Sequence, residues 1–192
     1  YYATFFESLD GFDTALGGTG AAAITGTHVD IATGATSGSS CLVQKIPTHQ
    51  NVLRWDREAR FRTELSLLEV TAQEVRISVG DSSNGVTDSH YGFYVEDATL
   101  NGTTSFNTTV ASVTLATLSA STVYSLEARY FPGQRVDFYV DDKLLGSISN
   151  ATSMPNQEST KTFVNLFTFY IENQEAVGKK ARCSWFEYIQ KR

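Results

Sequence analysis

The chain has 192 residues, of which 41% are hydrophobic and 19% are charged, and its net charge is −6. This length and composition suit one domain spanning 1–192. The negative charge argues against a nucleic-acid partner, because such a partner requires a basic surface that neutralises phosphates. No run of about 18 apolar residues is present, so we expect no membrane span. The basic clusters at 179–182 and 191–192 are interpreted as solvated strand ends.

The first 35 residues are small and rich in Gly, Ala and Thr. This composition predicts edge strands or an extended N-terminal arm over 1–35, which could pack on a neighbouring subunit. The chain begins at Tyr1 and contains a single methionine, Met154. We therefore expect a processed sequence or one cut from a longer chain, with no signal peptide visible.

Alternating polarity in the stretch 54–70 predicts a strand with one apolar and one polar face. The apolar face consists of Ala59, Phe61, Thr63, Leu65 and Leu67. The polar face consists of Arg60, Arg62, Glu64 and Ser66. Two further segments, 75–80 and 91–97, alternate in the same way and place Arg76 and Tyr94 on polar faces.

Two tight turns frame the next strand. Phe131-Pro132-Gly133-Gln134 predicts a hairpin turn, because proline presets φ and glycine accepts a positive φ. The segment 136–140 then alternates with Tyr139 outward, and Asp141-Asp142-Lys143 predicts the second turn. The segment 162–172 is apolar on both faces, which predicts a central strand covered on both sides.

About a dozen such strands, without helical periodicity, repeats or linkers, predict an all-β fold. The order indicates a two-sheet antiparallel β-sandwich with one curved, polar-lined face. On that face we expect glycan-binding residues that supply cationic donors, a carboxylate and flat rings. The candidates are Arg60, Arg62, Glu64, Arg76, Tyr94, Tyr139 and Tyr170. The alternative for the tyrosines is an ordinary sheet surface, which β propensity also favours.

No metal centre is expected from the cysteines and histidines. Neither Cys41 nor Cys183 has the spacing of a zinc site, and His28, His49 and His90 form no zinc motif. The acidic turns 10–13 and 81–88 could hold a structural Ca²⁺ through backbone carbonyls, although no full loop signature is present. No other cofactor is expected.

Three Asn-x-Thr sequons, at Asn101, Asn107 and Asn150, predict exposed glycosylation sites. Two of them fall within 101–109, a Thr-rich segment that we interpret as a loop. The sequons favour an extracellular or virion-surface location over the cytosol.

Several segments in order carry a resemblance to a known superfamily. They are 5–12, 31–36, 61–67, 80–81, 92–94, 124–128, 136–141 and 185–189. The chain resembles the concanavalin A-like lectin/glucanase superfamily, a jelly roll of two antiparallel sheets. It most resembles the module found in phage and viral structural proteins and in secreted surface proteins. In such jelly rolls the early and final strands are commonly neighbours in one sheet. The resemblance therefore implies a disulfide between Cys41 and Cys183.

Two enzyme types within this superfamily are alternatives. Arg62-Thr63-Glu64-Leu65 resembles a strand of a jelly-roll alginate-lyase family, in which the arginine helps to neutralise a uronate carboxylate. Such lyases also need a Gln-Ile-His triplet and a tyrosine strand, whereas here the next strand reads Val75-Arg76-Ile77-Ser78. The glycosidase pattern Glu-x-Asp-x-x-Glu has Ser66 in place of its Asp, and a regular strand points Glu64 and Glu69 to opposite faces.

We therefore expect a non-catalytic structural or adhesion module. It would belong to a virion, as a capsid-decoration, tail or receptor-binding component, or to an extracellular assembly. Its expected partners are other copies, other surface proteins and carbohydrate. The alternatives are a polysaccharide-active enzyme, lyase before hydrolase, and a soluble secreted lectin.

Overall fold

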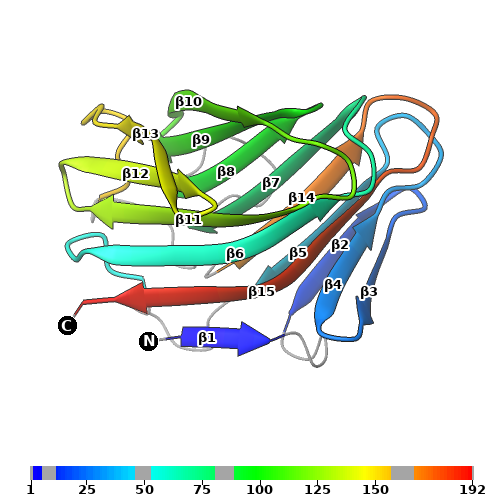
Figure 1. Cartoon of the computed structure of the whole chain (residues 1–192), viewed down its shortest axis with the longest axis horizontal. Helices are drawn as coiled ribbons and strands as arrows, with labels where there is room; N and C mark the ends of the chain where they lie inside the picture. Colours follow the sequence, from blue (N-terminus) through cyan, green and yellow to red (C-terminus); the bar gives the residue numbers. More distant parts are fainter. Residues whose placement is uncertain (1, 6–11, 46–52, 81–88, 157–166, 192) are drawn as a thin grey trace.

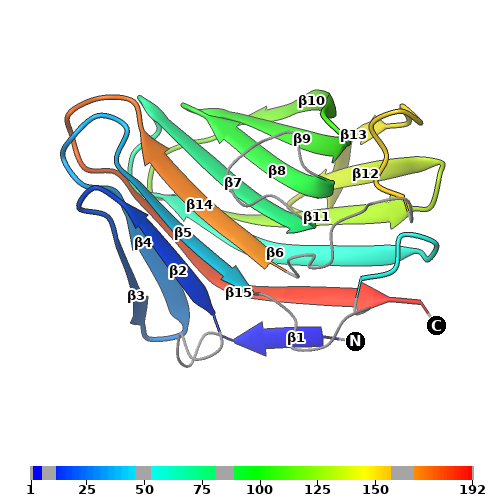
Figure 2. The ribbon, with the colours of Figure 1, turned by 180° about the vertical axis from the view of Figure 1, so that it is seen from behind.

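The computed structural model describes residues 2–5, 12–45, 53–80, 89–156 and 167–191. The described residues form fifteen strands and no helix, so none could span a membrane as a helix. The strands make two antiparallel sheets of eight and seven strands, which confirms the predicted all-β sandwich. Figures 1 and 2 show the two packed sheets from opposite sides.

The eight-stranded sheet is built around β15 and β6. Its strand order is β13-β12-β11-β6-β15-β4-β3, and β1 also pairs with β15. The bounds are β1 Tyr2–Phe5, β3 Ala21–Thr25, β4 His28–Ala32, β6 Ala59–Leu67, β11 Val123–Phe131, β12 Arg135–Val140, β13 Lys143–Ile148 and β15 Lys180–Gln190.

The seven-stranded sheet has the order β10-β9-β8-β7-β14-β5-β2. Its bounds are β2 Asp13–Gly17, β5 Ser40–Lys45, β7 Gln73–Gly80, β8 His90–Glu96, β9 Thr99–Phe106, β10 Thr109–Thr117 and β14 Phe167–Asn173. The N-terminal region thus supplies an edge strand to each sheet, β3 and β2, as its composition predicts. Packing of this region on a neighbouring subunit stays a prediction.

The core lies between the sheets and follows from the period-2 pattern of the strands. In β6 every second residue is buried, from Ala59 to Leu67. Aromatic rings fill the centre, where Phe167 of β14 stacks on Phe186 of β15 with ring centroids 4.5 Å apart. Tyr91 and Tyr130 stack in the same way at 5.4 Å, so rings from both sheets meet across the interface.

Tight turns connect several strands, and most stand where the sequence predicts them. In the β11–β12 turn Gly133 has φ 63°, and Gln134 donates a backbone hydrogen bond to Phe131 O at 3.0 Å. Asp141 and Asp142 have φ 50° and 63° between β12 and β13. Such paired positive φ values match the right-handed twist of flanking strands.

The segment 101–109 is not the loop that its composition predicts. It contains most of β9, a two-residue turn at Asn107 and Thr108, and the start of β10. Its threonines suit strands because β-branched side chains pack well on a pleated surface. The central-strand prediction for 162–172 applies only from Phe167 onward, since 162–166 lie outside the described residues.

The predicted disulfide between Cys41 and Cys183 is wrong. Both thiols are free and buried, and they belong to different sheets. Cys41 lies in β5, which pairs with β14 and β2, whereas Cys183 lies in β15 and its Sγ is 2.9 Å from Thr63 Oγ1. Burial raises the pKa of Cys41 to about 11 and that of Cys183 to about 12, so both are poor nucleophiles at neutral pH.

Candidate binding cleft on the eight-stranded sheet

The seven predicted glycan-binding residues do not share one face. Arg60, Arg62 and Glu64 point outward from β6, and Tyr139 lies on β12, all in the eight-stranded sheet. The other three lie on strands of the seven-stranded sheet. They are Arg76 on β7, Tyr94 on β8 and Tyr170 on β14. The chain changes sheet between β6 and β7, so the two groups occupy opposite outer faces of the sandwich (Figures 1 and 2).

The group on the seven-stranded sheet is a closed cluster. The guanidinium of Arg76 lies 5.9 Å from the ring centroid of Tyr94 and 5.1 Å from that of Tyr170. Glu74 pairs with Arg76 at 2.9 Å and accepts a hydrogen bond from Tyr94 Oη at 2.8 Å. Burial, together with a hydrogen bond to Glu172, raises the pKa of Tyr170 to about 12. The charged and hydroxyl groups of this cluster are therefore paired with one another, although Arg76 Nε has no hydrogen-bond partner among the described residues.

On the eight-stranded sheet, charged residues of β6, β11 and β15 form a set that we call the arginine ladder. It consists of Arg60, Arg62, Glu127, Arg129 and Glu187. Glu127, whose side chain is only 7% exposed, pairs with Arg62 at 3.0 Å and also with Arg129. Arg60 pairs with Glu187 at 2.7 Å. The register explains the first of these pairs, because Arg62 of β6 stands opposite Glu127 of β11. Arg60 instead reaches Glu187 diagonally, since its own register partner on β15 is Ile189.

The ladder also holds the aromatic residues of this face. The guanidinium of Arg129 lies 4.2 Å from the ring centroid of Tyr139, and that of Arg62 lies 5.9 Å from the ring of Trp185. Such contacts add to the ion pairs. Arg60 and Arg62, which the sequence suggested as ligand-binding cations, are thus paired with carboxylates of neighbouring strands.

A cleft of about 540 Å³ opens beside the ladder, over β4, β6 and β15. It is lined by His28, Asp30, Glu64, Ser66, Leu68, Ser121, Val123, Lys180, Ala181, Arg182 and Ser184. Only Glu64 among the sequence-predicted residues belongs to it. Arg60 and Arg62 belong to the ladder, Tyr139 packs against it, and the other three candidates lie on the opposite face.

A β-bulge in β15 creates the floor of the cleft. Cys183 pairs with Leu65 and Phe186 with Thr63, so two residues of β15, Ser184 and Trp185, stand opposite Glu64 alone. Ser184 lines the cleft, and Trp185 reaches the ring contact with Arg62. A bulge re-aims side chains in this way, and bulges are common beside functional sites.

The polar groups at the bulge lack partners. Within the described part of the chain, Glu64 makes no ion pair or hydrogen bond, and the hydroxyls of Ser66 and Ser184 make no side-chain hydrogen bond. His28, the first residue of β4, has a buried Nδ1 without a partner among the described residues. These groups contrast with the paired charges of the ladder.

One ion pair borders the free groups. Arg182 Nε and Nη2 donate to the two carboxylate oxygens of Asp30 at 2.6 and 2.8 Å. The hydrogen bond from Arg182 holds the pKa of Asp30 below its usual 3.8, although burial opposes this shift. Asp30, Arg182 and Ser66 are register partners across three adjacent strands, so the pair forms a fixed wall of the cleft.

The residues that the lyase and glycosidase alternatives require can be located in the structure. Arg62 and Tyr170, which a lyase would need on neighbouring strands, lie in different sheets. Glu69 follows the end of β6 and pairs with Lys179 at 2.9 Å, whereas Glu64 faces the cleft. Among the described residues no group of three His, Cys, Asp or Glu side chains could hold a metal ion. Most of the predicted calcium turns lie outside the described residues.

The three sequons occupy different environments. Asn107 and Asn150 are exposed in turns. Asn101 lies within β9 and is partly buried, and its Oδ1 accepts a hydrogen bond from Thr114 Oγ1 at 2.9 Å. Glycosylation stays a prediction, with Asn107 and Asn150 the more accessible acceptors.

No protein-family model matches the sequence, and no curated protein matches it either. Among solved structures, a protein of unknown function from Shewanella oneidensis MR-1 superposes with a TM-score of 0.68 at 16% identity, over 98% of this chain and 85% of that one. A sialidase superposes with a TM-score of 0.65 at 10% identity, over 94% of this chain and 17% of its own.

A botulinum neurotoxin type C structure, described by the dependence of cell entry on two ganglioside molecules, is also similar. It has a TM-score of 0.60 at 10% identity, over 93% of this chain and 43% of its own. This chain therefore spans less than half of the sialidase and toxin chains. At such low identities these similarities establish the β-sandwich and leave the site to be argued from its own residues.

Proposed function

We propose that this chain is a non-catalytic, concanavalin A-like binding module, and that the cleft binds a neutral, hydroxyl-rich glycan. The observation that carries this proposal is the set of unpartnered polar groups at the β15 bulge. Glu64, Ser66 and Ser184 converge there without partners among the described residues, beside His28. Polar groups that the fold leaves unpaired in a concave site are available to a ligand.

The chemistry of these groups favours sugar hydroxyls. A carboxylate can accept hydrogen bonds from two adjacent hydroxyls, and serine hydroxyls both donate and accept. Arg182 is already paired with Asp30, and the charge of Lys180 in the lining offsets that of Glu64, so the cleft has no excess charge that would favour an acidic sugar. Leu68 and Val123, which are 55% and 58% exposed, supply an apolar rim for the faces of a sugar ring.

The proposed setting is a surface assembly, either a virion component or a secreted adhesion protein. The fold shared with a toxin structure concerned with gangliosides supports a binding role by analogy. The exposed sequons at Asn107 and Asn150 suit an extracellular surface. The non-catalytic part of the proposal is supported by the separation of Arg62 and Tyr170 into different sheets.

A glycan array that includes neutral and sialylated oligosaccharides tests the proposal, followed by calorimetry with any hit. We expect Glu64→Gln to weaken binding of a neutral hit at least about 10-fold, because the charge-assisted hydrogen bonds are lost. Glu96→Gln, an exposed carboxylate on the opposite face, is the matched control and should bind as the wild type does.

Two results would overturn the proposal. One is wild-type affinity in Glu64→Gln together with loss of binding in Arg76→Ala, which would place the site on the seven-stranded sheet. The other is release of unsaturated uronate from alginate, which would show a lyase.

A further inference from the structure

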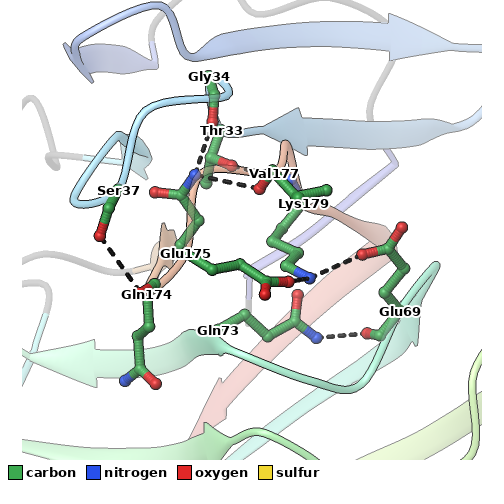
Figure 3. A network of polar contacts seen from close by, with 10 residues as sticks. Thr33, Gly34, Ser37, Glu69, Gln73, Gln174, Glu175, Val177 and Lys179 are labelled. Atoms are coloured by element: carbon green, nitrogen blue, oxygen red, sulfur yellow. Dashed lines mark hydrogen bonds and ion pairs between the residues drawn. The ribbon is translucent and has the colours of Figure 1, made fainter.

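Lys179, which the sequence places in a solvated cluster, is buried. It is 1% exposed and lies immediately before β15. Its Nζ lies 2.9 Å from Glu69 Oε2 and 2.5 Å from Glu175 Oε1 (Figure 3). Burial opposes the positive charge, but hydrogen bonds to Glu175 and Glu69 outweigh it and raise the pKa of Lys179.

Two fully buried amides line the same network. Gln73 Nε2 donates to Glu69 O, and Asn173 Nδ2 donates to Gly34 O at 2.7 Å and to Val177 O at 3.1 Å. The side-chain carbonyl oxygens of Gln73 and Asn173 have no partner within the described residues. Unpartnered buried oxygens are unusual in a folded protein, and these two belong to amides that hydrogen-bond the backbone of Glu69 and of Val177.

This donor set resembles that of a hard-cation site. Carboxylates and amide or backbone carbonyls are the oxygen ligands that Ca²⁺ takes in proteins. Here the lysine ammonium pairs with two such ligands, the carboxylates of Glu69 and Glu175. We propose that Lys179 is a tethered cation. Its ammonium neutralises Glu69 and Glu175 and so stabilises this end of the sandwich, as a bound structural metal ion would.

The network joins three connections that are distant in sequence. Lys179 N donates to Thr33 Oγ1 at 2.8 Å, and Thr33 N donates to Lys179 O at 2.9 Å, which ties the β14–β15 connection to the residues after β4. Glu69 brings in the β6–β7 connection. The next residue along, Lys180, accepts a backbone hydrogen bond from Leu68 at 3.0 Å, and both residues line the cleft.

The first test separates charge from packing by thermal unfolding. Lys179→Met keeps most of the side-chain volume and removes the charge, and we expect the melting temperature to fall by on the order of 10 °C. In a Glu69→Gln/Glu175→Gln background the same substitution should cost only a few degrees, because no carboxylates remain to be neutralised. Lys180→Met, at the exposed neighbouring lysine, is the control and should change the melting temperature little.

An equal loss in both backgrounds would show a packing role and overturn the proposal. If Lys179→Met does not fold, the triple variant decides. Folding of the triple variant supports a charge role, and its failure beside a folded Glu69→Gln/Glu175→Gln protein contradicts it.

The second test asks whether the vacated site accepts a metal ion. Millimolar Ca²⁺ should raise the melting temperature of Lys179→Ala by more than that of the wild type, and the added effect should vanish when Glu69→Gln and Glu175→Gln are introduced. A Lys179→Ala protein that responds to Ca²⁺ no more than the wild type would overturn the tethered-cation proposal. None of these measurements depends on glycan binding.

Discussion

The arginine ladder and the cleft lie side by side on one sheet and use the same kinds of residue to different ends. In the ladder, Arg62 and Arg129 share the buried carboxylate of Glu127, so each charge has a partner within the fold. In the cleft, Glu64 has none among the described residues. The contrast teaches that the density of charge on a β-sheet face is a poor guide to a binding site. The pairing state of each charge is the better guide.

The sharpest way to test this contrast is to remove the carboxylate at the centre of the ladder. Glu127→Ala removes the carboxylate that Arg62 and Arg129 share, and leaves Arg62 only its longer contact to the exposed Asp142 at 3.5 Å. We expect a loss of about 2 kcal/mol in the free energy of unfolding, reduced from the fully buried case because both arginines are partly exposed. Urea denaturation measures it. Glu64→Gln, two positions from Arg62 on the same face, should change stability by less than about 0.5 kcal/mol. Equal effects of the two substitutions would remove the distinction between ladder and cleft.

Arg62→Ala gives the complementary result. The sequence alone suggests that Arg62→Ala would weaken binding and leave the fold untouched, because the side chain points away from the core. Since Arg62 pairs with Glu127, we now expect a loss of about 1 kcal/mol in stability. Glycan affinity in the cleft should stay within about twofold. Calorimetry on the same preparation reports both quantities, and a large loss of affinity with unchanged stability would restore the original interpretation.

The bulge hydroxyls should contribute less than Glu64. Ser184→Ala removes one hydroxyl from the cleft floor, and we expect about a fivefold loss of glycan affinity, equivalent to one neutral hydrogen bond. Ser119→Ala is the control, because the side chain of Ser119 does not line the cleft. Ser147 is less suitable, since its hydroxyl donates a hydrogen bond to Asp137. Loss of affinity in Ser119→Ala as well would indicate a general structural effect.

The smallest expected effect concerns the ion pair that forms the cleft wall. The folded pKa of Asp30 lies below 3.8, so the stabilisation by Arg182 is present above pH 3.8 and is lost as the pH falls through the lowered value. Asp30→Asn should therefore cost less than about 1 kcal/mol at neutral pH, since both partners are partly exposed. The difference from the wild type should shrink below pH 3.8. A difference that persists at acid pH would assign the effect to packing.

Much of the fold could be predicted from the sequence because strands have a strict two-residue period. The alternation of β6 and the turns at Gly133 and Asp141 were sufficient to place those elements. The same period predicts which face of a strand is polar, but it does not predict which sheet the strand joins. The candidates Arg62 and Arg76 were therefore assigned to one face, although they lie in different sheets. The placing of Cys41 and Cys183 in one sheet came from the superfamily resemblance and is also wrong.

The candidate site was only partly predictable. Glu64 was identified, whereas His28, Asp30 and Arg182 meet it only through long-range pairing. The bulge did leave a signal, because the buried positions of β15 run Ala181, Cys183, Phe186 and Tyr188 and slip by one residue at Ser184. Lys179 left none, since a buried and an exposed lysine look alike in a sequence and differ only in the carboxylates that tertiary structure brings to them.

On one edge β15 has two successive partner strands, and this arrangement bears on how the cleft can change over evolution. On one side β15 pairs first with β4, up to Cys183, and then with β1, from Trp185, so Ser184 stands where one partner strand gives way to the other. Substitutions at this junction alter the side chains that line the cleft. They do not interrupt a continuous run of backbone hydrogen bonds on that side, because the pairing already changes partner there. Side-chain substitutions at Ser184 therefore change the surface of the cleft while the backbone hydrogen bonds of β15 with β4 and β1 are retained.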